Sequence, residues 1–257
     1  MIEMRSSFLD WFLYRRALRY WRKAAREASR AHLSLLRAQR ARARNLRHSL
    51  NEVISTADNR LALPMIGSHA FPKPHGTDWA WRPSLWSTSL PVPGRSTVQS
   101  KSQLGDEVTL FHDCQHSELT LRQIRNLREA DLAPFGLSMD VFNFDGSFLS
   151  LVLSLPDAAV QGLQRRHLIR VDTILELEKP LEIFVRLNIM HGPNTEQLVR
   201  ELPLHEENIA VEFDLAYSNI NEKRVERAWI DLIFDNPQMS QVTLRDLTLC
   251  RHPRAEL

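Results

Sequence analysis

Residues 167–192 read HLIRVDTILELE, then KP, then LEIFVRLNIMHG, and this stretch decides the fold. Two runs rich in aliphatic residues lie on either side of Lys179–Pro180, a charged break that contains a proline. This pattern predicts a β-hairpin. Because strand side chains alternate, the second run should bury one face and leave the other mixed. The residues of the buried face are Leu181, Ile183, Val185, Leu187 and Ile189.

The rest of the chain from Gly105 onward has the same character. It contains about ten short β runs bounded by turn residues, and Asp145–Gly146 resembles a second hairpin turn. No segment between these runs is long enough for the helical crossovers of a parallel sheet. We therefore expect a mainly β fold, an antiparallel β-sandwich of the jelly-roll type, preceded by a long N-terminal amphipathic α-helix.

Composition divides the chain into three regions. Residues 1–57 are a basic amphipathic helix, residues 58–104 are a connector rich in tryptophan and proline, and residues 105–257 are the β-sandwich domain. Within the connector, Trp79, Trp81 and Trp86 are expected to anchor it to the core. An exposed stacking platform for a base or a sugar is the alternative for these tryptophans.

The N-terminal region predicts one uninterrupted helix from about Ser7 to Asn51, because no glycine or proline occurs before Pro64. At 1.5 Å per residue this helix would be about 65–70 Å long. Its apolar residues follow a heptad seam formed by Tyr14, Leu18, Trp21, Ala25, Ala28, His32 and Leu35. The opposite face carries Arg15, Arg19, Arg22, Arg26, Arg30 and Arg37.

Three interpretations of this helix compete. Its seam could pack on a second copy, giving a homo-oligomer, or on the β domain. Its arginines could contact nucleic-acid phosphates, but no base-reading fold accompanies them, which disfavours nucleic acid. The helix could also lie on an anionic membrane, which the aromatic first turns favour. The residues expected to contact the membrane or partner are Phe8, Trp11, Phe12, Arg15, Arg19, Trp21 and Arg22.

Composition and charge limit the class of protein. Of the 257 residues, 43% are hydrophobic and 25% charged, as in ordinary soluble proteins. Residues 1–60 carry 14 Lys and Arg against 5 Asp and Glu, whereas the remainder carries 19 against 26. Two cysteines form no disulfide framework, and no apolar run is long enough to cross a bilayer. Without a secretory signal pattern, we expect a cytoplasmic protein, either free or peripheral on the inner membrane.

Residues 112–118 are the densest group of metal-ligand types. If this segment is extended, His112, Cys114, His116 and Glu118 share one face, as a zinc or iron site would require. β runs flank the segment, however, so a polar turn is the simpler interpretation. No nucleophile elbow, phosphate-binding loop or dinucleotide motif is present. The sequence therefore predicts neither a cofactor nor an enzyme, and a metal-dependent enzyme using this cluster is the alternative.

The polar faces of the predicted strands favour a different site. Charged and amide groups around one tryptophan suit a saccharide, whose hydroxyls need paired donors and acceptors and whose ring needs a flat apolar surface. Ordinary solvent-facing alternation is the competing interpretation. The candidate ligand-binding residues are Arg170, Asp172, Arg186, Asn188, Asp214, Trp229 and Asp231.

Two parts of the sequence resemble known families. The closing ERAWIDLIFDNPQMSQVTLRDLTLCRHPRAEL resembles the last two strands of jelly-roll, carbohydrate-binding-like modules found beside bacterial glycan-handling domains. The block LGDEVTLFHDCQHSELTLRQIRNLREADLAPFG, with RRHLIR and HGPNTEQLVRELPL, is similar to a domain-of-unknown-function family of uncharacterised bacterial proteins. The second resemblance implies no activity, and the arginine-rich helix lies outside both.

Taken with the strand pattern, these features predict a non-catalytic binding module, a carbohydrate-binding-like β-sandwich tethered by a basic amphipathic helix. A protein–protein interaction or scaffold role is a further alternative.

Overall fold

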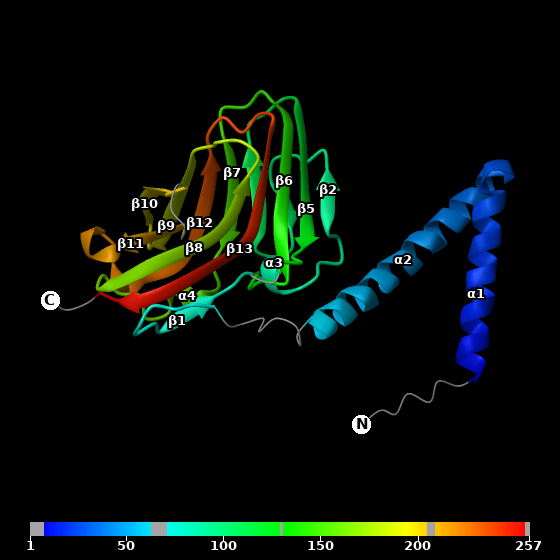
Figure 1. Cartoon of the computed structure of the whole chain (residues 1–257), viewed down its shortest axis with the longest axis horizontal. Coiled ribbons are helices and arrows are strands. Elements are labelled where there is room, and N and C mark those ends of the chain that lie inside the picture. The colour runs from blue at the N-terminus through cyan, green and yellow to red at the C-terminus, as the bar shows by residue number, and fades with distance from the viewer. Residues whose placement is uncertain (1–7, 63–70, 129–130, 205–208, 255–257) are drawn as a thin grey trace. The chain divides into compact units, whose positions relative to one another are not determined.

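The computed structural model describes residues 8–62, 71–128, 131–204 and 209–254. The chain divides into two units, residues 1–53 and residues 54–257, and each is treated by itself. The first unit is helical, and the second is a β-sandwich (Figure 1).

The N-terminal region is helical as expected, but it is not one helix. It forms α1 (Phe8–Glu27), a 3₁₀ turn (Ala28–Arg30) and α2 (Leu33–Ala62). Ala31 is extended, and His32 follows it as the cap of α2: its Nδ1 lies 2.8 Å from the Ser34 hydroxyl and accepts from the Ser34 amide at 3.4 Å. The prediction of a single helix was wrong because a histidine cap gives none of the usual sequence signals for a helix start.

The break also ends the predicted heptad seam. Of the seven seam residues, Leu18, Trp21 and Ala28 are half-buried, whereas Tyr14, Ala25, His32 and Leu35 are exposed. The half-buried residues around the break are Leu18, Trp21, Ala24 and Ala28 before it, Ala31 at the break, and Leu36, Gln39 and Ala43 after it.

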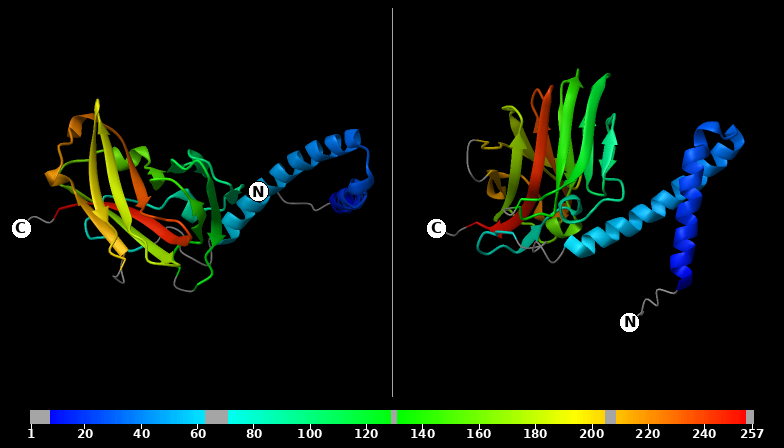
Figure 2. Two further views of the ribbon diagram at one scale, coloured as in Figure 1. Left: turned by 90° about the horizontal axis from the view of Figure 1, so that it is seen from above. Right: turned by 45° about the vertical axis from the view of Figure 1, so that its right-hand side comes forward.

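The second unit consists of two antiparallel sheets packed face to face, which confirms the predicted sandwich. Within the described residues, the larger sheet is seven-stranded, with the order β11-β8-β13-β6-β5-β2 and β1 paired to β13. Figure 1 shows β8, β13, β6 and β5 in front and β9, β12 and β7 behind; Figure 2 gives two further views. Its strands are β1 (Trp79–Trp81), β2 (Gly94–Ser96), β5 (Ser117–Arg125), β6 (Phe135–Phe144), β8 (His167–Leu177), β11 (Ile209–Asp214) and β13 (Ser240–Pro253).

The other sheet is six-stranded within the described residues, with the order β10-β9-β12-β7-β4-β3. Its strands are β3 (Ser102–Leu104), β4 (Val108–His112), β7 (Leu149–Ser154), β9 (Ile183–His191), β10 (Asn194–Glu201) and β12 (Val225–Phe234). In the described part of the sandwich, four short helical segments join the strands: α3 (Ser84–Ser87), α4 (Asp157–Val160), η2 (Leu215–Tyr217) and η3 (Glu222–Arg224).

The stretch 167–192 forms two strands, but they are not a hairpin. β8 pairs with β11 and β13, whereas β9 pairs with β10 and β12, so Lys179–Pro180 carries the chain from one sheet to the other. Asp145–Gly146 does the same between β6 and β7. Both runs have one aliphatic face, and a sandwich buries two such faces by opposing them across the core. Alternation alone does not distinguish that arrangement from side-by-side pairing.

Residues 71–104 contribute to the sandwich instead of only connecting to it. They supply β1, β2 and β3 to the two sheets, so the sandwich begins before residue 105. Trp86 is fully buried, and its indole nitrogen donates to the Leu244 carbonyl at 3.0 Å. Trp79 and Trp81 are partly buried against the core. The expected anchoring of these tryptophans is therefore confirmed.

Candidate functional site

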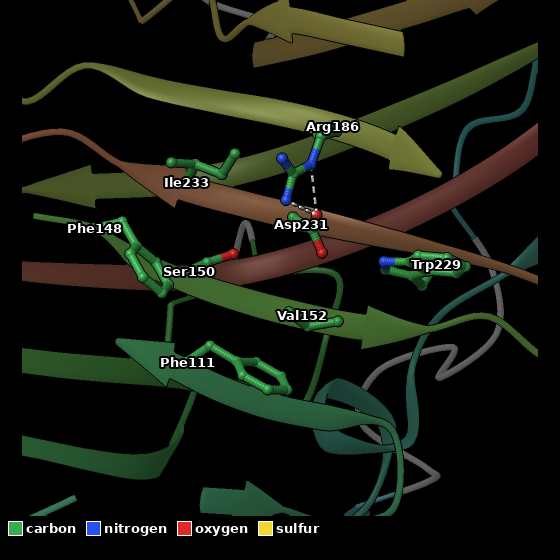
Figure 3. A pocket seen from close by; sticks show the side chains of 8 residues that line it. All are labelled: Phe111, Phe148, Ser150, Val152, Arg186, Trp229, Asp231 and Ile233. Carbon is green, nitrogen blue, oxygen red and sulfur yellow. Dashed lines mark hydrogen bonds and ion pairs between the residues drawn. The ribbon is translucent and has the colours of Figure 1, made fainter. Parts of the chain in front are cut away.

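The outer face of the six-stranded sheet carries a hollow of about 490 Å³. The hollow results from the alternation of side chains along the strands. On β7 and β12, every second side chain, such as Leu151 and Leu232, points into the core, and the side chains between them point outward. Four adjacent strands contribute to the lining, together with Phe148 just before β7 (Figure 3). The lining residues are Phe111, Phe148, Ser150, Val152, Arg186, Trp229, Asp231 and Ile233.

The polar centre of this hollow is an ion pair between neighbouring strands. Arg186 on β9 lies opposite Asp231 on β12 and contacts its Oδ2 through Nε at 2.7 Å and Nη2 at 2.6 Å. Asn188 donates to the same oxygen at 3.0 Å, and Gln197 donates to the Asn188 carbonyl oxygen at 3.1 Å. This chain of bonds fixes the guanidinium at the edge of the hollow.

Hydrogen-bonding capacity remains on this face. Among the described residues, all the bonds to the Asp231 carboxylate end on Oδ2, and Oδ1 points away from the guanidinium (Figure 3). The Ser150 hydroxyl is buried and has no partner in the described part of the chain. Ser150 lines the hollow, and buried hydroxyls are normally hydrogen-bonded.

The remaining walls are apolar. Trp229, Phe111 and Phe148 come from three different parts of the sheet, and Val152 and Ile233 lie between them. The Arg227 guanidinium carbon lies 5.3 Å from the centre of the Trp229 ring, which helps to fix that ring. An antiparallel sheet usually presents polar residues to solvent, so this apolar face is unusual.

Four of the seven predicted site residues lie together here: Arg186, Asn188, Trp229 and Asp231. Sequence reasoning missed Phe111, Phe148 and Ser150, which belong to strands earlier in the chain. Their signal was the alternation of VTLFH and FLSLVLS, which places them on outward positions. Nothing in one sequence indicated that these strands would lie beside β12.

The other three predicted residues lie on the seven-stranded sheet. Arg170 forms ion pairs with Asp172 at 2.8 Å and Glu212 at 3.1 Å, and the Asp172 hydrogen bond, foremost among the causes, raises the pKa of Arg170. Asp214 accepts from the Ala216 amide at 2.9 Å, capping a 3₁₀ turn. The structure therefore separates these residues from Trp229, because β8 and β11 belong to the seven-stranded sheet and β12 to the six-stranded sheet.

The proposed metal ligands are not brought together. His112 is buried, with Nε2 3.1 Å from the Val98 carbonyl and Nδ1 accepting from the Cys114 amide at 3.2 Å. Glu118 lies on β5, in the opposite sheet from His112. Burial, the largest influence, raises the pKa of the Cys114 thiol. Among the described residues, no group of three or more His, Cys, Asp or Glu is placed to hold a metal ion.

The whole chain, residues 1–257, matches one protein family, described as a family of unknown function (DUF6478). The chain belongs to DUF6478. The expected resemblance to a domain of unknown function is thus confirmed, but its extent was underestimated, since the DUF6478 match includes the arginine-rich helices. A search of the curated proteins found no match.

Among solved structures, this DUF6478 chain is similar to the family 11 carbohydrate-binding module of Clostridium thermocellum, at 12% identity and a TM-score of 0.39, over 65% of this chain and 99% of that one. It is also similar to the CBM22-1 xylan-binding domain of Paenibacillus barcinonensis Xyn10C, at 8% identity and a TM-score of 0.35, over 63% and 94%. A third similar structure, at 8% identity and a TM-score of 0.40, is the enzymatically active domain of bacteriophage CBA120 tailspike protein 4. That match covers 60% of this chain and 21% of the tailspike. At these identities and TM-scores, neither a ligand nor the role of any residue can be assigned to this chain from the similar structures.

Proposed function

We propose that the outer face of the six-stranded sheet binds a saccharide without cleaving it. One observation carries this proposal: an apolar, aromatic-walled hollow surrounds the fixed Arg186–Asp231 pair and the unpartnered Ser150 hydroxyl. A sugar ring offers both surfaces that such a site needs, an apolar C–H face and a rim of hydroxyls that donate and accept.

Each lining group has a role in this interaction. Trp229 and Phe111 contact the C–H face, because aromatic rings supply large apolar area in a rigid form. Asp231 accepts from a sugar hydroxyl through Oδ1. Arg186, whose side chain is 35% exposed, donates from its Nη1, which no described residue engages. Ser150 supplies a hydroxyl that both donates and accepts.

The set of acidic groups favours binding over hydrolysis. Most glycosidases use two carboxyl groups on either side of the scissile bond, about 5–9.5 Å apart. Among the eight described lining residues named above, Asp231 is the single acidic one, and its Oδ2 is already held by Arg186 and Asn188. This arrangement supports a non-catalytic module.

A glycan array followed by calorimetric titration of the best-binding oligosaccharide tests the proposal. Trp229→Ala should weaken binding at least tenfold, corresponding to about 1.4 kcal/mol or more. The control is Phe142→Ala, which removes an exposed aromatic from β6 on the other sheet and should leave affinity unchanged. An array without hits, or equal affinity of both variants, would reject saccharide binding at this face and favour a protein-interaction role.

A further inference from the structure

Helix α1 exposes apolar side chains that no part of its own unit covers. Leu13 and Tyr14 are 60% and 65% exposed, and Tyr20 is 47% exposed. Among the described residues of the helical unit, none belongs to the buried hydrophobic core. Helices in proteins gain most of their stability by packing an amphipathic face, so α1 needs a surface to pack on.

The charges of α1 are segregated from this apolar face. Between Asp10 and Glu27 the helix carries six basic residues and no acidic one. At about 100° per residue, all six fall within roughly one third of the circumference. The basic residues are Arg15, Arg16, Arg19, Arg22, Lys23 and Arg26. Leu13, Tyr14, Ala17, Leu18, Tyr20 and Trp21 occupy the opposite side.

The length of α1 determines how it can meet a bilayer. It has 20 residues, but neither it nor any other described helix combines the length and apolarity needed to span a membrane. A helix with segregated faces of this kind lies in the plane of the interface instead. The His32 cap separates α1 from α2, so α1 can adopt that position as an element of its own.

We propose that α1 binds the surface of an anionic bilayer. Leu13, Tyr14 and Tyr20 enter the boundary between headgroups and acyl chains, and the basic face contacts lipid phosphates. Tyrosine and tryptophan suit this depth because their rings are apolar and their tips are polar. The proposal is independent of saccharide binding by the sandwich.

The same observations disfavour nucleic acid and a second copy of the helix as partners. Nucleic acid would use the arginines but would leave the Leu13–Tyr14–Tyr20 surface in water. A helix dimer would use a narrow seam, whereas Leu13 and Tyr20 lie to one side of the predicted Tyr14–Leu18–Trp21 seam. A purely basic polar face also offers a second copy no opposite charges for interhelical pairing, and it complements an anionic surface.

Co-sedimentation of the full-length protein with vesicles tests this proposal. Vesicles of phosphatidylcholine with about one third phosphatidylglycerol should bind the protein, and binding should fall steeply as salt rises from about 50 to about 500 mM because the Debye length shortens. Leu13→Glu should weaken binding about tenfold or more, since it places a carboxylate in the apolar face. The control Leu46→Glu makes the same change at an exposed leucine of α2 and should bind like the parent.

Binding that is lost in Leu13→Glu, retained in Leu46→Glu and weakened by salt supports the proposal. Absence of binding to anionic vesicles, equal binding to pure phosphatidylcholine, or equal loss in both variants overturns it. A salt-resistant dimer without vesicle binding would assign the apolar face of α1 to a second copy.

Discussion

Arg186 directs two nitrogens, Nε and Nη2, at a single oxygen of Asp231, at 2.7 and 2.6 Å. The two residues face each other across the β9–β12 pairing, and the Asp231 side chain is only 4% exposed. A nearly buried carboxylate thus receives its counter-charge from a side chain that stays in contact with solvent. The same ion pair joins β9 to β12 and supplies the charged groups of the hollow on the outer face of the sheet.

Arg186→Ala should therefore destabilise the protein. Among the described residues, removal of the Arg186 side chain leaves Asn188 as the single hydrogen-bond partner of the buried Asp231 carboxylate, and uncompensated buried charges are costly. Because Arg186 is about one third exposed, we expect about 1–3 kcal/mol, less than for a fully buried pair. Urea unfolding measures the change. The control Arg200→Ala on edge strand β10 should change stability by less than about 0.5 kcal/mol, and equal effects would mean that the ion pair contributes little.

Trp86 tests whether residues 71–104 belong to the sandwich. It is fully buried and donates to the Leu244 carbonyl, so Trp86→Ala should cost about 3–5 kcal/mol in the free energy of unfolding. A fragment of residues 71–257 should melt cooperatively, and a fragment of residues 105–257 should not. Cooperative melting of the shorter fragment would show that β1, α3, β2 and β3 are dispensable.

The stability of the sandwich should fall in mild acid because of His167. Burial, the largest influence, lowers the pKa of His167 below its ordinary 6.5, although Asp78 opposes this. The unfolded chain then binds a proton that the folded protein does not, so the free energy of unfolding decreases as pH falls below about 6.5. Unfolding curves between about pH 8 and pH 5 should show a shallower decrease for His167→Asn than for the parent. In the control His116→Asn, which changes an exposed histidine, the free energy of unfolding should depend on pH as in the parent. If His167→Asn also showed the parent's pH dependence, the expectation would be contradicted.

At lower pH, Asp78 should contribute a second loss of stability. Burial, the largest influence on Asp78, would raise its pKa, but the hydrogen bond and charge of Arg251 lower it overall, below the ordinary 3.8. The favourable contribution is present above about pH 3.8 and is lost as pH falls through the lowered pKa. Asp78→Asn should therefore flatten the acid limb of the stability curve below about pH 4. An unchanged acid limb would show that the Asp78–Arg251 pair does not couple to folding.

Strand positions and faces could be predicted from the sequence, but strand neighbours could not. Alternation in LEIFVRLNIMHG identified the buried face of β9, since Ile183, Val185 and Leu187 are core residues. It did not reveal that Lys179–Pro180 crosses between sheets. Side chains alternate with a period of two both when two strands pair within one sheet and when they face each other across the core. The candidate site was accordingly half predicted: Arg186 and Trp229 were found, Phe111 and Phe148 were not, and Arg170 was assigned to the wrong neighbourhood.

The helix break had a different cause. Sequence rules place breaks at glycine and proline, and none occurs between Phe8 and Ala62. The structure breaks the helix at Ala31 through the local His32–Ser34 contact, which is a side-chain geometry and not a composition signal. The heptad pattern therefore predicted correctly that this region is helical, but wrongly that it forms one continuous helix.

The most direct test of the saccharide site is the indole Nε1–H signal of Trp229 in a ¹⁵N–¹H NMR spectrum, assigned from its disappearance in Trp229→Phe. During titration with the best array oligosaccharide, this signal should shift saturably, while that of the buried Trp86 stays in place. A Trp229 signal that remains unshifted while the oligosaccharide binds, or no binding of any array glycan, would contradict a saccharide site on the outer face of the six-stranded sheet.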